Sequence, residues 1–93
     1  MHAILIRKAM GETLRTLRLD AGMTLREVSV ASMVSLGYLS EIERGCKEAS
    51  SEVLFAITQA LGVSLSEVLH LVSKRVAEQE NSRVSPRRIA LAA

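Results

Sequence analysis

The chain has 93 residues, of which 48% are apolar, 24% charged and 2% aromatic, and its net charge is +2. This length allows one domain with a small core and no second domain. The apolar run at residues 3–6 is too short to span a bilayer, and it precedes the first basic residues instead of following them as in a secretion signal. We therefore expect a soluble, cytoplasmic protein without a membrane partner.

Cysteine and histidine are too few for a disulfide scaffold or a metal site. Cys46 is the single cysteine and cannot form an internal disulfide. The two histidines, His2 and His70, have no metal-ligand spacing with it. The chain also lacks a Ser/His/Asp set, a pair of carboxylates placed for acid–base work and a glycine-rich phosphate loop. The sequence predicts neither an enzyme nor a bound metal or cofactor.

The basic charge is concentrated at the two ends of the chain. Residues 1–48 carry a net +1, residues 49–73 a net −2 and residues 74–93 a net +3. A total of +2 is too small to identify a nucleic-acid-binding protein, because basic clusters are often ordinary solvated faces. Whether these charges bind nucleic acid depends on where the fold places them.

Helix signals dominate the chain, and strand signals are missing. Apolar residues at helical spacing predict a first helix over about residues 4–21, which Gly22 closes as a left-handed cap. Thr24 and Glu27 have the spacing of a capping box, so a second helix begins at Leu25 and runs to about residue 33. Ser35 then caps a third helix that Gly45 ends.

Two further helices follow a polar loop. The fourth begins at residue 50 or 51 and ends before Gly62, and the fifth follows Ser64 and runs to about Gln79. Residues 80–93 are predicted to form a flexible tail, which leaves residues 4–79 as the folded domain. The apolar stripe of the fifth helix outlasts a small core, so residues 65–79 are expected to form a homodimer surface. This surface consists of Leu65, Val68, Leu69, Val72 and Val76.

The second and third helices are short and joined by a tight turn. This arrangement is typical of the helix-turn-helix, in which the second helix of the pair lies in the DNA major groove. Spacing alone does not separate it from other helical hairpins. The discriminating evidence has to come from the residues themselves.

Three segments carry a family resemblance: GMTLREV at residues 22–28, VSLGYLSEIERG at residues 34–45 and ALGVSLSEVL at residues 60–69. They are similar to the Xre (Cro/C1-type) helix-turn-helix family, over about residues 4–72. More narrowly, TLREV at residues 24–28, VSLGYLSEIERG at residues 34–45 and KEASSE at residues 47–52 resemble the actinobacterial activators of Clp protease genes. The resemblance implies an all-α, five-helix, lambda-repressor-like DNA-binding domain with an extended fifth helix.

The chain departs from the family pattern at two positions. Leu25 stands where the family usually has glutamine, which leaves the backbone N–H of Leu25 and the hydroxyl of Thr24 to meet a phosphate. Met33 stands where the family usually has glycine in the turn between the two helices. A positive φ at a methionine costs about 1 kcal/mol, so we expect the turn to take a different path.

Helix-turn-helix geometry selects the residues that can reach DNA. Base contacts are expected from Leu36, Gly37, Tyr38 and Glu41 at the start of the third helix and one turn later, with Glu41 able to accept from cytosine N4. Phosphate contacts are expected from Thr24, Leu25, Ser35, Ser40, Arg44 and Lys47. The family resemblance further implies a structural ion pair between Arg18 and Glu43.

The resulting hypothesis is a homodimeric activator of Clp protease and related stress genes that binds a pseudo-palindromic operator. Its expected partners are double-stranded DNA, a second copy of the chain, RNA polymerase and Clp protease, at the nucleoid. A Clp degradation signal is expected at the C-terminal residues Leu91, Ala92 and Ala93. Two alternatives on the same fold remain open: a restriction-system controller, and an antitoxin or adaptor that binds a protein partner.

Overall fold

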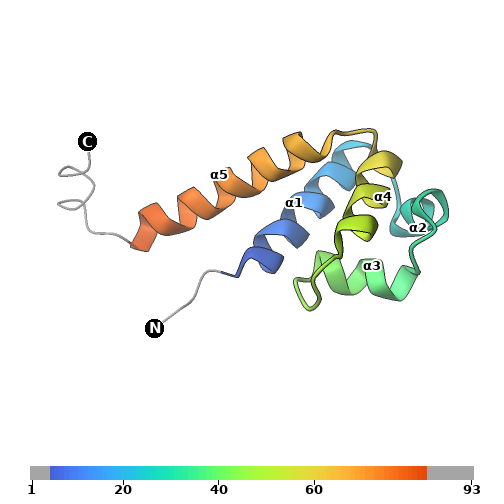
Figure 1. Ribbon diagram of the computed structural model, residues 1–93, viewed down its shortest axis with the longest axis horizontal. Coiled ribbons are helices and arrows are strands. Elements are labelled where there is room, and N and C mark those ends of the chain that lie inside the picture. Colours follow the sequence, from blue (N-terminus) through green and yellow to red (C-terminus); the bar gives the residue numbers. More distant parts are fainter. Residues whose placement is uncertain (1–4, 84–93) are drawn as a thin grey trace.

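The computed structural model describes residues 5–83, and within that range the chain folds into five helices and no strand (Figure 1). The all-α, five-helix prediction is confirmed. The helices are α1 (Ile6–Asp20), α2 (Leu25–Ser32), α3 (Leu36–Glu43), α4 (Ser51–Leu61) and α5 (Leu65–Arg83). The predicted tail begins within α5, and residues 84–93, with the candidate degradation signal, lie outside the described residues.

Side-chain caps start four of the helices where the sequence predicts them. The backbone N–H of Glu27 donates to Thr24 Oγ1 over 3.0 Å, and the Thr24 N–H donates to Glu27 Oε1 over 2.8 Å, which completes the capping box of α2. Ser35, Ser50 and Ser64 accept from the backbone three residues later in the same way. Because each cap satisfies a backbone donor that the helix leaves free, these residues fix the starts of α2 to α5.

Two helix boundaries differ from the prediction. Leu5 has extended φ and ψ of −99° and 112°, so α1 begins at Ile6 and not at Ile4. At the other end, α5 continues to Arg83, four residues beyond the expected end at Gln79. The apolar stripe stops near Gln79, but neither glycine nor proline follows before Pro86 to end the helix.

The turn between α2 and α3 contradicts the prediction that Met33 avoids a positive φ. Met33 has φ 60° and ψ 25°, the left-handed conformation, and caps the C-terminus of α2. Hydrogen bonds on both sides hold this turn: Ser29 Oγ donates to the Val34 carbonyl over 2.6 Å, and the Val34 N–H donates to Ser32 Oγ over 3.3 Å. The side chain of Met33 is 92% exposed, so it meets no steric obstacle. The surrounding contacts therefore impose the strained conformation.

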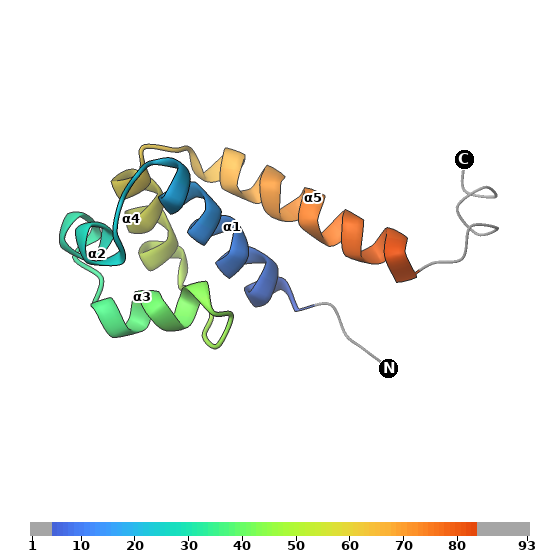
Figure 2. The ribbon, with the colours of Figure 1, turned by 180° about the vertical axis from the view of Figure 1, so that it is seen from behind.

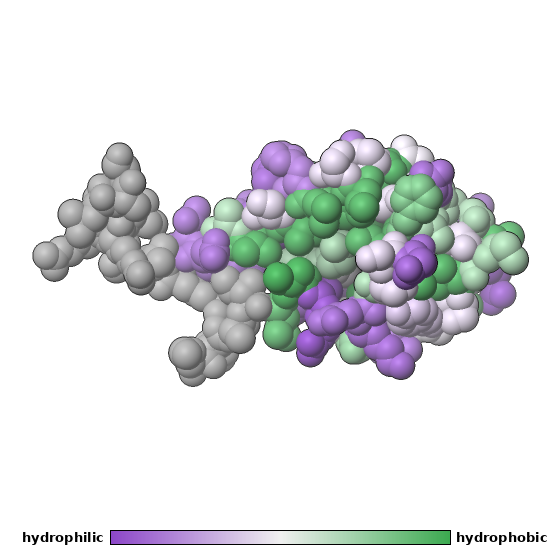
Figure 3. Space-filling model, in the orientation of Figure 1, coloured by the Kyte–Doolittle hydropathy of each residue, from purple (hydrophilic) through white to green (hydrophobic). Residues whose placement is uncertain are grey.

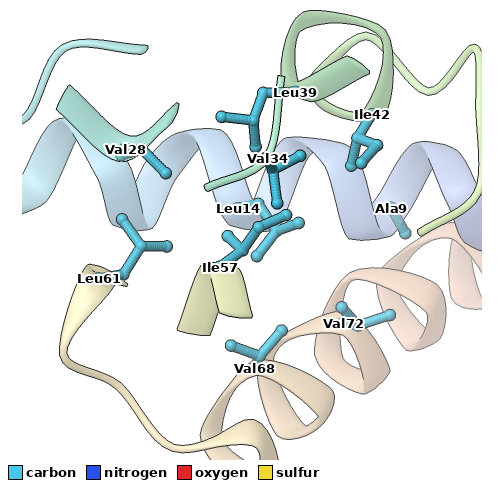
Figure 4. Close-up of a cluster of buried hydrophobic side chains, with 10 residues drawn as sticks. All are labelled: Ala9, Leu14, Val28, Val34, Leu39, Ile42, Ile57, Leu61, Val68 and Val72. Atoms are coloured by element: carbon cyan, nitrogen blue, oxygen red, sulfur yellow. The ribbon is translucent and has the colours of Figure 1, made fainter. Parts of the chain in front are cut away.

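The core lies where α1 packs between α3 and α5, an arrangement visible from both sides of the molecule (Figures 1 and 2). α4 closes the core against α2 and α5. All five helices contribute side chains to the buried cluster, and Val34 joins it from the turn before α3 (Figure 4). Its members are Ala9, Leu14, Val28, Val34, Leu39, Ile42, Ile57, Leu61, Val68 and Val72.

Within residues 5–83, no single helix is long and apolar enough to cross a membrane. By length and composition alone, α4 and α5 would pass as a pair, but the chain bends by 102° between them. The most apolar residues of the pair, such as Ile57 and Val68, belong to the protein core.

Candidate nucleic-acid interface

The third helix has an inner face in the core and an outer face open to solvent. Leu39 and Ile42 are buried on the inner face. On the outer face Gly37 is exposed and Glu41 is half-buried, one helical turn apart. The half-buried Leu36 lies beside Gly37 at the start of the helix. This face therefore holds three of the four residues expected to read bases, and their contact with DNA stays a prediction.

Tyr38, the fourth expected base reader, contacts the protein itself. Its ring packs against the core, and its hydroxyl donates to the backbone carbonyl of Glu48 over 2.8 Å. The only proton of the hydroxyl is thus engaged in the loop that follows α3. Base reading by Tyr38 stays a prediction, but the structure gives the residue a second role.

The residues expected at phosphates gather around the N-termini of α2 and α3 and the end of α3. Thr24 and Ser35 are exposed, and each accepts a hydrogen bond from its own helix, which leaves the hydroxyl proton free to donate. Leu25 and Ser40 are half-buried. The backbone N–H groups at the starts of α2 and α3 point outward and favour an anion.

Two cations lie at the C-terminal end of α3 and just beyond it. Arg44, the C-terminal cap of α3, is exposed, and its Nε donates to the Ser40 carbonyl over 3.3 Å. Lys47 is also exposed, and its Nζ lies 3.9 Å from Glu41 Oε1. A contact of that length between exposed groups contributes little to stability, so Lys47 can turn toward a phosphate at small cost.

The ion pair between Arg18 and Glu43 is confirmed and joins α1 to the end of α3. Arg18 Nε donates to Glu43 Oε2 over 2.8 Å and Arg18 Nη2 to Glu43 Oε1 over 3.0 Å, a two-pronged geometry. A third donor, Nη1, reaches the Met23 carbonyl over 3.0 Å. The hydrogen bonds with Glu43 raise the pKa of Arg18 above its ordinary value despite partial burial, so the guanidinium stays charged.

A glycine lets α1 and α3 approach closely at the same place. A Cβ at Gly11 would collide with the backbone carbonyl of Ile42 and would lie 2.7 Å from the carbonyl of Glu43. Only glycine fits this contact without moving one of the helices. Gly11 and the Arg18–Glu43 pair therefore fix the position of α3 relative to α1.

Two long-range hydrogen bonds were not predicted from the sequence. Arg7 Nε donates to the Gly45 carbonyl over 3.0 Å, and Arg75 Nη2 donates to Thr16 Oγ1 over 2.9 Å. Their partners lie 38 and 59 residues apart in the chain. No local pattern links residues at such separations, so only the fold reveals these contacts.

The predicted dimer surface needs correction. Val68 is 0% exposed and Val72 is 6% exposed, because α5 packs both against the core of the same chain. Neither can contact a second copy. Leu65 and Leu69 are 36% and 48% exposed, and Val76 is half-buried. The apolar stripe of α5 is thus divided between the core and the surface.

Residues 5–83 contain no group of three His, Cys, Asp or Glu side chains that could hold a metal ion. The candidate site is the surface formed by α2, α3 and the residues that follow α3. It combines a capped helix pair, an open face on the second helix and cations beside it, which is the geometry of a DNA-binding helix-turn-helix.

The sequence profile of the helix-turn-helix family matches residues 14–68, and the chain belongs to this family, in its Xre-type branch. It is a DNA-binding transcriptional regulator. Among curated proteins it is similar to the transcriptional regulator ClgR from Mycobacterium tuberculosis (strain ATCC 25618 / H37Rv). The two are 54% identical over 85 residues, which cover 90% of this chain and 76% of that protein.

Solved structures agree. The crystal structure of the clp gene regulator ClgR from Corynebacterium glutamicum is 49% identical, with a TM-score of 0.81, over 85% of this chain and 84% of that chain. The restriction-modification controller protein C.Esp1396I, solved as a tetramer with its natural 35 base-pair operator, has a TM-score of 0.74. Its 23% identity shows a shared fold alone. These relatives are regulators of genes and not enzymes.

Proposed function

We propose that the chain regulates Clp protease genes, as an activator that binds a pseudo-palindromic operator as a homodimer. The observation that carries this proposal is the 54% identity with ClgR across 90% of the chain, which includes the whole of α2 and α3. The ClgR structure from Corynebacterium glutamicum is described as a clp gene regulator. As an activator, this chain would contact RNA polymerase while bound to chromosomal DNA in the cytoplasm.

In the proposed complex, α3 lies in the major groove with its outer face toward the bases. Glu41 is the residue with the clearest reading chemistry, because a carboxylate accepts from cytosine N4 and is repelled by phosphates elsewhere. The helix starts at Thr24 and Ser35, together with Arg44 and Lys47, would contact the phosphates on either side.

A homodimer is proposed because one reading helix contacts only about four to six base pairs, too few for useful selectivity. Three large apolar side chains are available for its interface: Phe55 on α4 is 54% exposed, and Leu65 and Leu69 on α5 remain open. A broad band of apolar residues crosses the face on which α4, α1 and α5 lie (Figure 3). A second copy would cover these side chains. C.Esp1396I, which shares this fold, binds its operator as a tetramer.

The reading role is tested by selecting binding sites from random duplexes with the wild-type chain and with Glu41→Ala. We expect Glu41→Ala to relax the preference at one base pair per half-site by about 1–3 kcal/mol, the value of one good base contact. Glu78→Ala, which removes an exposed glutamate from α5, is the matched control and should leave the preference unchanged. An identical selected sequence for Glu41→Ala would exclude Glu41 as a reader.

The regulatory role is tested by mapping the DNA fragments that the wild-type chain retains from the genome of its source and by measuring Clp protease transcripts without it. Retention of the promoters of Clp protease genes, with lower transcript levels in the deletion strain, is the expected result. Retention of other promoters only would contradict the assignment to Clp genes. Higher transcript levels in the deletion strain would identify a repressor.

The dimer surface is tested with Leu69→Asp and a neighbouring control, His70→Asp, since both side chains are exposed on α5. Light scattering should show a folded monomer for Leu69→Asp, because a buried unpaired carboxylate destabilises an apolar interface. His70→Asp should keep the mass of the dimer. An unchanged mass for Leu69→Asp would rule this surface out.

A further inference from the structure

The loop between α3 and α4, residues 44–50, is anchored by hydrogen bonds from two helices. Tyr38 of α3 donates through its hydroxyl to the Glu48 carbonyl over 2.8 Å, and Arg7 of α1 donates through Nε to the Gly45 carbonyl over 3.0 Å. At Gly45 the backbone has φ +75°, and an added Cβ would lie 2.9 Å from the Cα of Lys8. The first half of the loop is therefore pressed against α1.

The space behind this loop is not filled by packed side chains. A hollow of about 310 Å³ lies between α1, the loop and α4, and its lining includes Met10, Ile42 and Leu54 with Lys47 and Glu48 of the loop. Close-packed side chains behind a loop hold it through many small van der Waals contacts, and a hollow provides few of these contacts. The position of this loop depends correspondingly more on its hydrogen bonds.

Lys47 lies between two anchor points of the loop, Gly45 and Glu48. The residue before it is also held, because the Cys46 N–H donates to the Glu41 carbonyl over 2.9 Å. The ammonium group of Lys47 is exposed and lies 3.9 Å from the carboxylate of Glu41, on the reading face of α3. Where the loop stands thus determines where this cation meets the DNA. Holding it in place before binding avoids part of the entropy that ordering a loop would cost at the interface.

We propose that Tyr38 is a positioning residue for DNA binding: its hydroxyl holds the Glu48 carbonyl, and this contact places Lys47 at a phosphate. The inference rests on the proposed mode of DNA binding, with α3 in the groove. In this role Tyr38 would influence affinity without a base contact. A hydroxyl that donates to a carbonyl of its own chain has no second proton to donate to a phosphate.

The test is a double-mutant cycle with Tyr38→Phe and Lys47→Ala on the duplex that the wild-type chain selects. Tyr38→Phe keeps the ring in its packed position, so unfolding by urea should show a folded protein. We expect Tyr38→Phe alone to weaken binding about two- to tenfold, the range for one net hydrogen bond. In the Lys47→Ala background the same substitution should change binding less than about twofold, because the group it positions is gone.

Two further measurements separate positioning from direct contact. Tyr38→Phe should lower the slope of log affinity against log salt by up to about 0.9, the value of one phosphate contact, and leave the selected sequence unchanged. Without DNA, hydrogen exchange should become faster at the amides of residues 45–49 and stay unchanged in α1 and α4. A merely structural role would not produce this combination.

Other results would overturn the proposal. An equal loss of affinity in both backgrounds would mean that the hydroxyl contacts DNA itself, and a changed selected sequence would make Tyr38 a base reader. Unchanged affinity and exchange would show that the loop stands without it. If the wild-type chain selects no duplex, the proposed function fails as well; if it binds normally and Tyr38→Phe behaves identically, only the positioning role fails.

Discussion

Met33 offers a substitution that should stabilise the protein. It is the only non-glycine residue with positive φ among residues 5–83, and the left-handed conformation costs an L-amino acid about 1–2 kcal/mol. Glycine removes this cost, but it raises the entropy of the unfolded chain by an equivalent of about 0.5–1 kcal/mol. Because the Met33 side chain is 92% exposed, its removal loses little buried area. We expect Met33→Gly to stabilise the fold by about 0.5–1 kcal/mol.

Unfolding by urea or heat, followed by circular dichroism, measures this change. For a domain of this size, 1 kcal/mol corresponds to about 4–8 °C in Tm, so an increase of about 2–8 °C is expected. The variants have to be compared at one protein concentration, since the proposed dimer would make Tm depend on concentration.

Two further variants at the same position isolate the energetic cost of the positive φ from the effect of removing the side chain. Met33→Ala removes the same exposed side chain but keeps a Cβ, so its stability should stay within about 0.5 kcal/mol of the wild type. Met33→Asn should lie between alanine and glycine, because asparagine tolerates the left-handed region better than other side chains. Equal stabilities for Met33→Gly and Met33→Ala would refute the reasoning and show that the turn carries no strain at this residue.

Further substitutions test the packing of α1, α3 and α5. Gly11→Ala should lose about 1–3 kcal/mol of stability in urea unfolding, because its Cβ meets backbone carbonyls that cannot move freely. Gly37→Ala places its Cβ in open space, so it should gain up to about 1 kcal/mol of stability. Arg18→Ala should lose about 2–4 kcal/mol of stability, because it leaves the carboxylate of Glu43, which is 10% exposed, without its partner. The double variant Arg18→Met/Glu43→Leu should lose less stability, because it leaves no unpaired charge. Val72→Asp should unfold the chain, seen as lost helical circular dichroism, instead of giving a folded monomer.

The helix order could be predicted because its signals are local. Thr24 and Ser35 cap helices through backbone groups only three residues away, and Gly22 has the left-handed φ of +69° that its position after α1 requires. Each signal is independent of the rest of the fold. The boundaries of α2, α3 and α4 therefore followed from residue type and spacing.

The division of the α5 stripe could not be predicted. The spacing of Val68, Leu69 and Val72 shows that one side of the helix is apolar, but it does not say which neighbour covers each residue. In the structure Val68 and Val72 are buried in the core, where α5 packs on α1 and α4, and Leu69 is exposed. Of these two helices, α1 lies about fifty residues away in the chain, so only the packed fold assigns the two roles.

The contacts of the site were predicted unevenly for the same reason. The Arg18–Glu43 pair was inferred from a family resemblance, and no spacing rule would have joined residues 25 positions apart. The Tyr38 hydroxyl was assigned to DNA because its place on the helix is near the groove. Its contact with Glu48 depends on the path of the following loop, which local sequence does not specify.

The contacts that hold α3 in the fold are separate from the face that we propose meets DNA. The inner side of α3 is fixed by Leu39 and Ile42 in the core, and its end by the close approach of Gly11 and the bonds between Arg18 and Glu43. None of these contacts uses the outer face. In the proposed complex, a substitution on the outer face should change recognition without removing a contact that the fold needs. A substitution at an inner contact should instead move the whole outer face. Loss of stability and loss of sequence preference should therefore occur in different variants.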